Sequence, residues 1–252
     1  KFTNSICDIC HTACTHDEYD SDDTCARCHA PFAVRVEHTD SAGLTSNKLY
    51  MKTTDEYGND VTLKQVFNEA VSGSTVTLLA NIEWGVTPKA RATITGDDKI
   101  VTLNLNGHTI TGGWFDIGSN DNPTSCTLKI IGKGSHESLG GSGGYSGVFP
   151  KATLDLSEWK GGTINAINIS DNSKYDETTR EAAVIVGPKA GTIGKLSFGN
   201  NQLDKLKKTK LSGGSFNEIW VADFGPVKLG ELLADGYAFQ NGDGSYVEYG
   251  RT

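Results

Sequence analysis

The first thirty residues contain a cluster of cysteine and histidine side chains whose spacing is suited to metal binding. Two C-x-x-C pairs flank a C-x-H pair, so thiolates and an imidazole recur at short, fixed separations. Donors of this kind hold Zn²⁺ in a tetrahedral site. We therefore predict a small N-terminal zinc-binding knob, with these candidate ligands: Cys7, Cys10, Cys14, His16, Cys25 and Cys28.

One tetrahedral ion needs only four of these six donors, and the two C-x-x-C pairs alone would form a ribbon with two knuckles. A closed set of four such donors is available, which favours a structural ion over a catalytic one. Both pairs are also followed by histidine, which is the attachment signature of c-type haem. A short polar segment offers little apolar wrapping for haem, and disulfides or free thiols are the remaining alternative.

Acidic side chains are numerous elsewhere, but their spacing does not converge on one point. Polysaccharide lyases need clustered acids that hold Ca²⁺ beside a basic residue, and glycoside hydrolases need paired carboxylates. We therefore predict that the chain is not an enzyme and assign no catalytic residue. The acids considered were Asp116, Asp121, Asp155, Glu158, Asp171, Asp176, Glu177 and Glu181.

The four tryptophans suggest binding, because each lies in or beside an expected β run next to polar residues. Large aromatic side chains on a rigid surface serve as contacts for sugar rings or as hot spots for proteins. Packing into the core is the alternative for each of them. The candidate ligand-binding residues are Trp84, Trp114, Trp159 and Trp220.

The elements that must position these residues are mostly short β runs separated by Gly, Asn and Asp. The chain has 252 residues, 30 of them glycine, and a formal net charge of −8, which opposes a basic nucleic-acid footprint. It has no apolar stretch long enough to span a membrane. Strands are expected at Phe32–Val36, Thr75–Ala80, Val101–Leu105, Leu128–Ile131, Ala152–Leu156, Ile164–Ile169, Ala183–Val186, Leu196–Phe198 and Phe216–Val221.

One amphipathic helix is expected from Thr62 to Val71, with Thr62 and Gln65 as a capping box and Gly73 as its stop. A second short helix is expected after Pro226, ending at Gly236, and a hairpin-like tail after it.

The β runs repeat imperfectly, as a small-residue turn followed by an inward Ile or Phe. Ile110 is followed by equivalents 54, 29 and 23 residues apart, at Ile164, Ile193 and Phe216. We expect a degenerate copy around Gly134-Ser135-His136 and a period of ~25 residues, which indicates a solenoid. Asn106-Gly107-His108 is expected at a corner, and Cys126 as a buried thiol.

One turn of such a solenoid can bury its inward side chains only by stacking on the turns before and after it, as in a parallel β-helix. The predicted fold is all-β: a right-handed parallel β-helix with an N-terminal capping helix and a zinc-binding knob. Residues 1–36 are the knob, 37–60 a connection, 61–222 the β-helix with its capping helix, and 223–252 a helix-hairpin cap.

Four strings in this order resemble modular surface proteins of gut and oral Gram-positive bacteria. Similar strings open and close right-handed β-helix modules in that group, often beside a C-x-H…C-x-x-C knob. By that likeness Cys14, His16, Cys25 and Cys28 would be the zinc ligands. The strings are Leu63–Ala70, Ser74–Leu79, Thr102–Ile110 and Leu233–Phe239.

The resemblance implies an extracellular bacterial binding module, cell-wall-attached or secreted, and a monomeric part of a larger chain. Its expected partner is a host glycoprotein or glycan, and immunoglobulin is a candidate. The alternatives are a carbohydrate-active β-helix enzyme, either a polysaccharide lyase or a glycoside hydrolase, and a structural stalk segment. The chain opens on Lys1 without an initiator Met, as expected for a fragment.

Overall fold

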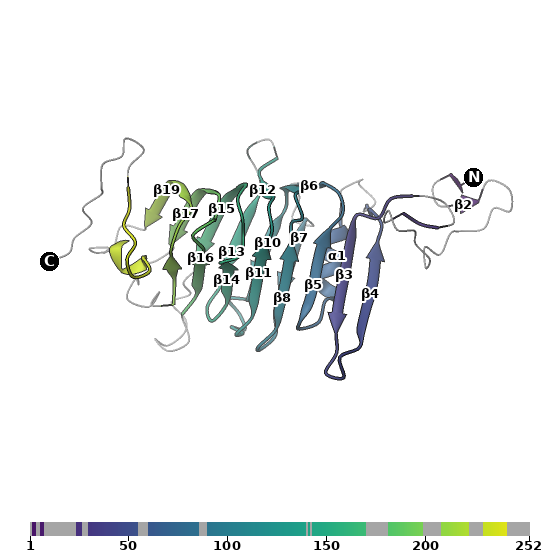
Figure 1. The fold of residues 1–252 in the computed structure, drawn as a ribbon, viewed down its shortest axis with the longest axis horizontal. Helices are drawn as coiled ribbons and strands as arrows, with labels where there is room; N and C mark the ends of the chain where they lie inside the picture. The colour runs from purple at the N-terminus through teal and green to yellow at the C-terminus, as the bar shows by residue number, and fades with distance from the viewer. Residues whose placement is uncertain are drawn as a thin grey trace.

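The computed structural model describes residues 2–3, 6–7, 24–26, 30–54, 60–85, 90–139, 141, 143–169, 181–198, 208–221 and 229–240. Most of them form short β-strands that stack along one long axis (Figure 1). Neighbouring strands come from successive passages of the chain and pair in parallel. The described part of the chain is therefore a β-solenoid.

One face of the solenoid is a sheet of eight strands among the described residues. Its parallel part runs from β18 to β5, and β3 and β4 add an antiparallel hairpin at one end. Across the sheet the order is β18 (Lys210–Leu211), β16 (Ala183–Val186), β14 (Thr153–Leu156), β11 (Thr127–Ile131), β8 (Ile100–Asn104), β5 (Ser74–Leu78), β3 (Val34–Thr39) and β4 (Thr45–Tyr50).

The second sheet has nine described strands and bends at β15 (Thr163–Ile169). The beginning of β15 pairs with β12 through Ile164, whereas its end pairs with β13 from Ala166 onward. β17 (Thr192–Phe198) and β19 (Ser215–Val221) stack on β15 along its whole length. The shorter strands are β6 (Ile82–Gly85), β9 (Thr109–Gly112) and β12 (Ser135–Glu137) on one half, and β7 (Arg91–Ile94), β10 (Trp114–Ile117) and β13 (Tyr145–Val148) on the other.

Four further described elements lie outside the two sheets. β1 (Phe2–Thr3) and β2 (Ile6–Cys7) pair antiparallel, and η2 (Leu229–Leu232) is a short 3₁₀ helix near the other end. The helix α1 (Thr62–Glu69) packs against β7 and buries its apolar side. Phe67 of α1 meets Phe115 of β10 edge to face, with ring centroids 5.2 Å apart.

The pairing register confirms the repeat expected from the sequence. Strand pairs bring equivalent inward residues into one row across β6, β9, β12, β15, β17 and β19. The degenerate copy falls at His136, which pairs with Ile110 on one side and Ile164 on the other. The full row is Ile82, Ile110, His136, Ile164, Ile193 and Phe216.

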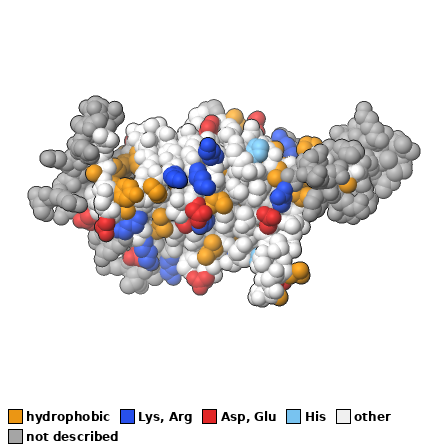
Figure 2. Space-filling view, viewed as in Figure 1, with side chains coloured by type: hydrophobic (Ala, Val, Ile, Leu, Met, Phe, Trp, Pro, Cys, Tyr) orange, Lys and Arg blue, Asp and Glu red, His pale blue; other side chains and the backbone are white. Residues whose placement is uncertain are grey.

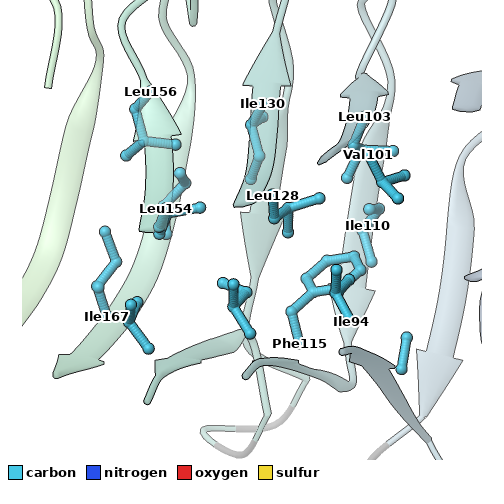
Figure 3. Packing of buried hydrophobic residues seen from close by; sticks show 14 of the residues in the cluster. Ile94, Val101, Leu103, Ile110, Phe115, Leu128, Ile130, Leu154, Leu156 and Ile167 are labelled. Atoms are coloured by element: carbon cyan, nitrogen blue, oxygen red, sulfur yellow. The ribbon is translucent and has the colours of Figure 1, made fainter. Parts of the chain in front are cut away.

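The core fills the space between the two sheets (Figure 3). Val101, Leu128 and Leu154 form another in-register row on β8, β11 and β14, and all three are fully buried. They point toward Phe115 and Ile167 of the second sheet. Burial of one such aliphatic side chain contributes about 1.5–3 kcal/mol, so each added turn extends a core that already exists.

Two expectations from the sequence differ from the structure, one in the hairpin of β3 and β4 and one at the start of α1. Residues 37–60, predicted as a connection, include the end of β3 and all of β4. The expected capping box at Thr62 and Gln65 is also wrong, because the N-cap is Val61 and makes no side-chain cap bond. Instead Asp60 Oδ1 accepts a hydrogen bond from the Thr62 amide at 2.9 Å. The hairpin-like tail lies largely outside the described residues.

The expected corner at Asn106-Gly107 is confirmed. Both residues have positive φ, at 50° and 84°. The Asn106 side-chain amide donates to the Leu78 carbonyl at 3.0 Å, so it satisfies a backbone group of the preceding turn.

Glycine is required at another corner, where successive turns approach closely. A Cβ added at Gly162 would lie 2.1 Å from the Gly134 carbonyl oxygen, whereas one at Gly161 would meet nothing within 4 Å. Both glycines have positive φ, at 113° and 108°. An alanine at Gly161 would therefore introduce backbone strain alone, whereas an alanine at Gly162 would introduce strain and steric overlap together.

We expect Gly161→Ala to lower the free energy of unfolding by about 1–3 kcal/mol, through backbone strain alone. Gly162→Ala should cost several kcal/mol more, because its methyl group also overlaps the Gly134 carbonyl oxygen, which accepts a hydrogen bond from Trp159 Nε1. Urea unfolding followed by circular dichroism measures both variants. Equal losses for the two would contradict the close approach of the turns at Gly162.

His136 is a titratable side chain enclosed in this core. Its Nε2 lies 2.9 Å from the Gly112 carbonyl oxygen, which only accepts, so Nε2 carries the proton of the neutral ring. Nδ1 is buried without a hydrogen-bond partner, and Phe115 stacks edge to face at 5.2 Å. Burial lowers the pKa of His136 to about 4, despite the opposing hydrogen bonds to the backbone.

This pKa makes stability depend on pH in a defined direction. Between the ordinary histidine pKa of about 6.5 and the folded value of about 4, the unfolded chain binds the proton that the folded chain excludes. We expect this one group to lower the unfolding free energy by about 3 kcal/mol as pH falls from 7 to 4. His136→Leu should show a shallower slope in urea unfolding across that range. Identical slopes would show that His136 is solvated.

Candidate binding face

Two of the four tryptophans proposed for a binding surface are instead core residues. Trp84 and Trp159 are both 0% exposed. Trp84 packs against Phe115 with centroids 5.0 Å apart, and Trp159 Nε1 donates to the Gly134 carbonyl at 3.0 Å. Their assignment to a ligand-binding surface is therefore wrong, because no ligand can reach them without unfolding the turns around them.

The other two tryptophans lie on one outward face. Trp114 of β10 is half-buried, and Trp220 of β19 is 45% exposed. We call this surface the aromatic face: the outward residues of β7, β10 and β13 and of the second halves of β15, β17 and β19. Two members of this face, Ala166 and Ser197, are covered by their neighbours and buried. Register places the residues in two rows, Arg91, Trp114, Tyr145, Ala166, Lys195 and Glu218, and Thr93, Asp116, Gly147, Asn168, Ser197 and Trp220.

Tyr145 is the residue of this face that sequence analysis missed. It is 37% exposed, begins β13 and lies directly opposite Trp114 in the ladder. Neighbouring strands are about 4.8 Å apart, so the two side chains are adjacent on the surface. The alternating string Tyr145-Ser146-Gly147-Val148 is a signal that could have indicated this strand, but a glycine-rich stretch precedes it.

The charges of the aromatic face occur as pairs. Arg91 Nη1 lies 2.9 Å from Asp116 Oδ2, and Lys195 Nζ lies 2.9 Å from Glu218 Oε1. Burial raises the pKa of Asp116, and the neighbouring Arg91 guanidinium opposes that rise. Lys195 Nζ also lies 5.5 Å from the centre of the Trp220 ring, a cation–π contact.

Other described acids lie elsewhere. Asp155 is on β14 of the eight-stranded sheet, Glu158 pairs with Lys129 of that same sheet, and Glu181 pairs with Lys208 at 2.7 Å. Both signs of charge also mix on the side of the molecule seen in Figure 2. Asp171, Asp176 and Glu177 lie outside the described residues. The prediction that the chain is not an enzyme stays a prediction.

The zinc prediction also falls mostly outside the described part of the chain. Of its six candidate ligands, the structure describes the side chain of Cys25 alone, which is 0% exposed and packs with Phe32. Among the described residues no group of three or more His, Cys, Asp or Glu side chains could hold an ion. The site at Cys7, Cys10, Cys14, His16, Cys25 and Cys28 stays a prediction.

Cys126 is a buried thiol, as expected. Its Sγ donates to the Ile94 carbonyl at 3.0 Å, and burial raises its pKa. The thiolate form that would react is therefore disfavoured.

No described helix is both long and apolar enough to cross a membrane. Comparison with protein-family models, curated proteins and solved structures found no match to this chain.

The pairing of Asp116 with Arg91 can be tested by titration. We expect Arg91→Ala to raise the pKa of Asp116 further, because it removes the cation and leaves the effect of burial. Carbon-detected NMR of the Asp116 carboxyl group measures the change, with Lys195→Ala as the matched control in the other ion pair. An unchanged titration in Arg91→Ala would contradict the ion pair.

Proposed function

We propose that this chain is an extracellular binding module of a bacterial surface protein and that it recognises a host glycoprotein or glycan through the aromatic face. The observation that carries the proposal is the combination of Trp114, Tyr145 and Trp220 on one regular, hydrogen-bonded sheet. Aromatic anchors provide much of the affinity at binding surfaces.

Rigidity supports the same proposal. β10 and β13, which present Trp114 and Tyr145, are each paired on both sides in register, whereas β19, which presents Trp220, pairs with β17 alone among the described strands. A pre-ordered surface loses little conformational entropy when it binds. A uniformly polar flank would instead suit a structural stalk, and the acids described do not converge as an enzyme would require.

The proposal includes the finer features expected from the sequence. The coil is right-handed, the hand that parallel strand crossovers adopt. The helix α1 caps one end, supported by burial of Leu63, Val66 and Phe67. A structural Zn²⁺ holds the N-terminal knob. The module is a monomeric part of a larger cell-wall-attached or secreted protein, and immunoglobulin is a candidate partner by resemblance.

A binding screen tests the proposed function. The purified chain would be measured against pooled human immunoglobulins, mucins and a glycan array, with and without a metal chelator. We expect saturable binding that survives chelation and falls at least about tenfold in Trp220→Ala or Tyr145→Ala.

Ile100→Ala provides the matched control, because Ile100 is 49% exposed on β8 of the other sheet. Equal loss in this control, or loss of binding on chelation while the fold stays intact, would place the site away from the aromatic face. Turnover of an acidic glycan would contradict the proposal in favour of an enzyme.

A further inference from the structure

We infer that the part of the aromatic face around Asp116 and Gly147 is a subsite for a neutral glycan, with Trp114 and Tyr145 as its stacking platform. The inference rests on the proposed function and specifies its ligand class. Only one of the two carboxylate oxygens of Asp116 takes part in its ion pair.

Asp116 makes its described ion pair with one oxygen only. Oδ2 accepts from Arg91 Nη1 at 2.9 Å, whereas Oδ1 lies 3.5 Å from the point that a Cβ at Gly147 would occupy. The side chain of Asp116 is only 17% exposed, so the residues packed around it restrict the position of its carboxylate. One acceptor oxygen thus lies beside a position that has no side chain.

The conformation of the backbone does not demand glycine at position 147. Gly147 does not have a positive φ, unlike most glycines at the corners. A methyl group there would approach the Phe149 ring at 3.3 Å, which needs only a small shift of that ring. Position 147 therefore adds no side chain beside Asp116 Oδ1, and the Phe149 ring is the other group at this point.

The groups around this position suit a sugar ring. Trp114 and Tyr145 lie side by side in the adjacent row, and large aromatic surfaces stack on the apolar C–H face of a pyranose. Asn168 is exposed on the other side of Gly147 in register, where its amide can both donate and accept. A carboxylate oxygen accepts hydrogen bonds from hydroxyl groups, and such charge-assisted bonds are strong.

The charge of the face selects among glycans. Arg91 pairs with Asp116 and Lys195 pairs with Glu218, so these charges cancel and the face offers no net positive charge to a carboxylate or sulfate of the ligand. An anionic sugar beside Asp116 would meet like charge. A neutral sugar needs no counterion and can use Asp116 Oδ1 directly.

The test uses the whole 252-residue chain and neutral oligosaccharides of galactose, mannose and N-acetylglucosamine, each beside its sialylated or sulfated derivative. Affinity would be measured by calorimetry for the best array hits. We expect binding to the neutral members, and an affinity lower by about tenfold or more in Asp116→Asn and in Gly147→Ala. Trp114→Ala should lose at least as much.

Gly147→Ala keeps every polar partner and adds one methyl group, so it separates the subsite from the stability of the fold. Circular dichroism and thermal unfolding would confirm that the variant is folded, and Ile100→Ala should bind as the unmodified chain does. Equal affinity of Gly147→Ala and the unmodified chain for the neutral glycans would overturn the inference, and so would preference for the acidic derivatives.

The failure of this inference can be distinguished from failure of the proposed function. If a host glycoprotein binds equally well after enzymatic deglycosylation, and Tyr145→Ala still weakens it, the aromatic face binds protein and the glycan subsite is wrong. If no glycan or glycoprotein binds at this face, both are wrong.

Discussion

The in-register parallel pairing of successive turns is the constraint on which the rest of this structure depends. Each strand hydrogen-bonds to the equivalent strand of the turns before and after it, so like positions stack in rows along the axis. An inward row is then mostly apolar along its length, and an outward row becomes a line of side chains at about 4.8 Å spacing. The core and the aromatic face are two results of the same register.

The register also explains where unusual residues are tolerated. His136 occupies an inward row between Ile110 and Ile164, and it remains neutral because its surroundings exclude water. Corners bring backbone against backbone, so Gly162 cannot carry a side chain. On the outer face neither restriction applies. Asp116 and other side chains of that face can contact a ligand, and Gly147 adds no side chain between them.

The sequence contained enough information to predict the solenoid, its period and the corner at Asn106, because these follow from turn residues and inward β-branched side chains. It also predicted the degenerate copy at His136. The burial of Trp84 could have been foreseen, since it shares its inward side with Ile82 two residues earlier. Trp159 lies in a turn after β14, where the strand alternation of inward and outward residues does not apply. Its burial accompanies a parallel bridge to Gly132 of the preceding turn, which only the register reveals.

The composition of the aromatic face was less predictable. Tyr145 and Trp114 are 31 positions apart in the sequence, and only the pairing of β10 with β13 makes them neighbours. The pairing of Arg91 with Asp116 depends on the same register. Likewise, β4 consists mainly of polar residues that carry no strong strand signal, although the start of β3, with which it pairs, lies in the strand expected at Phe32–Val36.

The most direct test of the aromatic face is an amide chemical-shift map of the chain during titration with the neutral oligosaccharides. The account predicts that the shifts concentrate on Trp114, Asp116, Tyr145, Gly147 and Asn168, on adjacent strands of one face. Shifts that concentrate on the eight-stranded sheet or on the N-terminal segment, with these five amides unchanged, would contradict it.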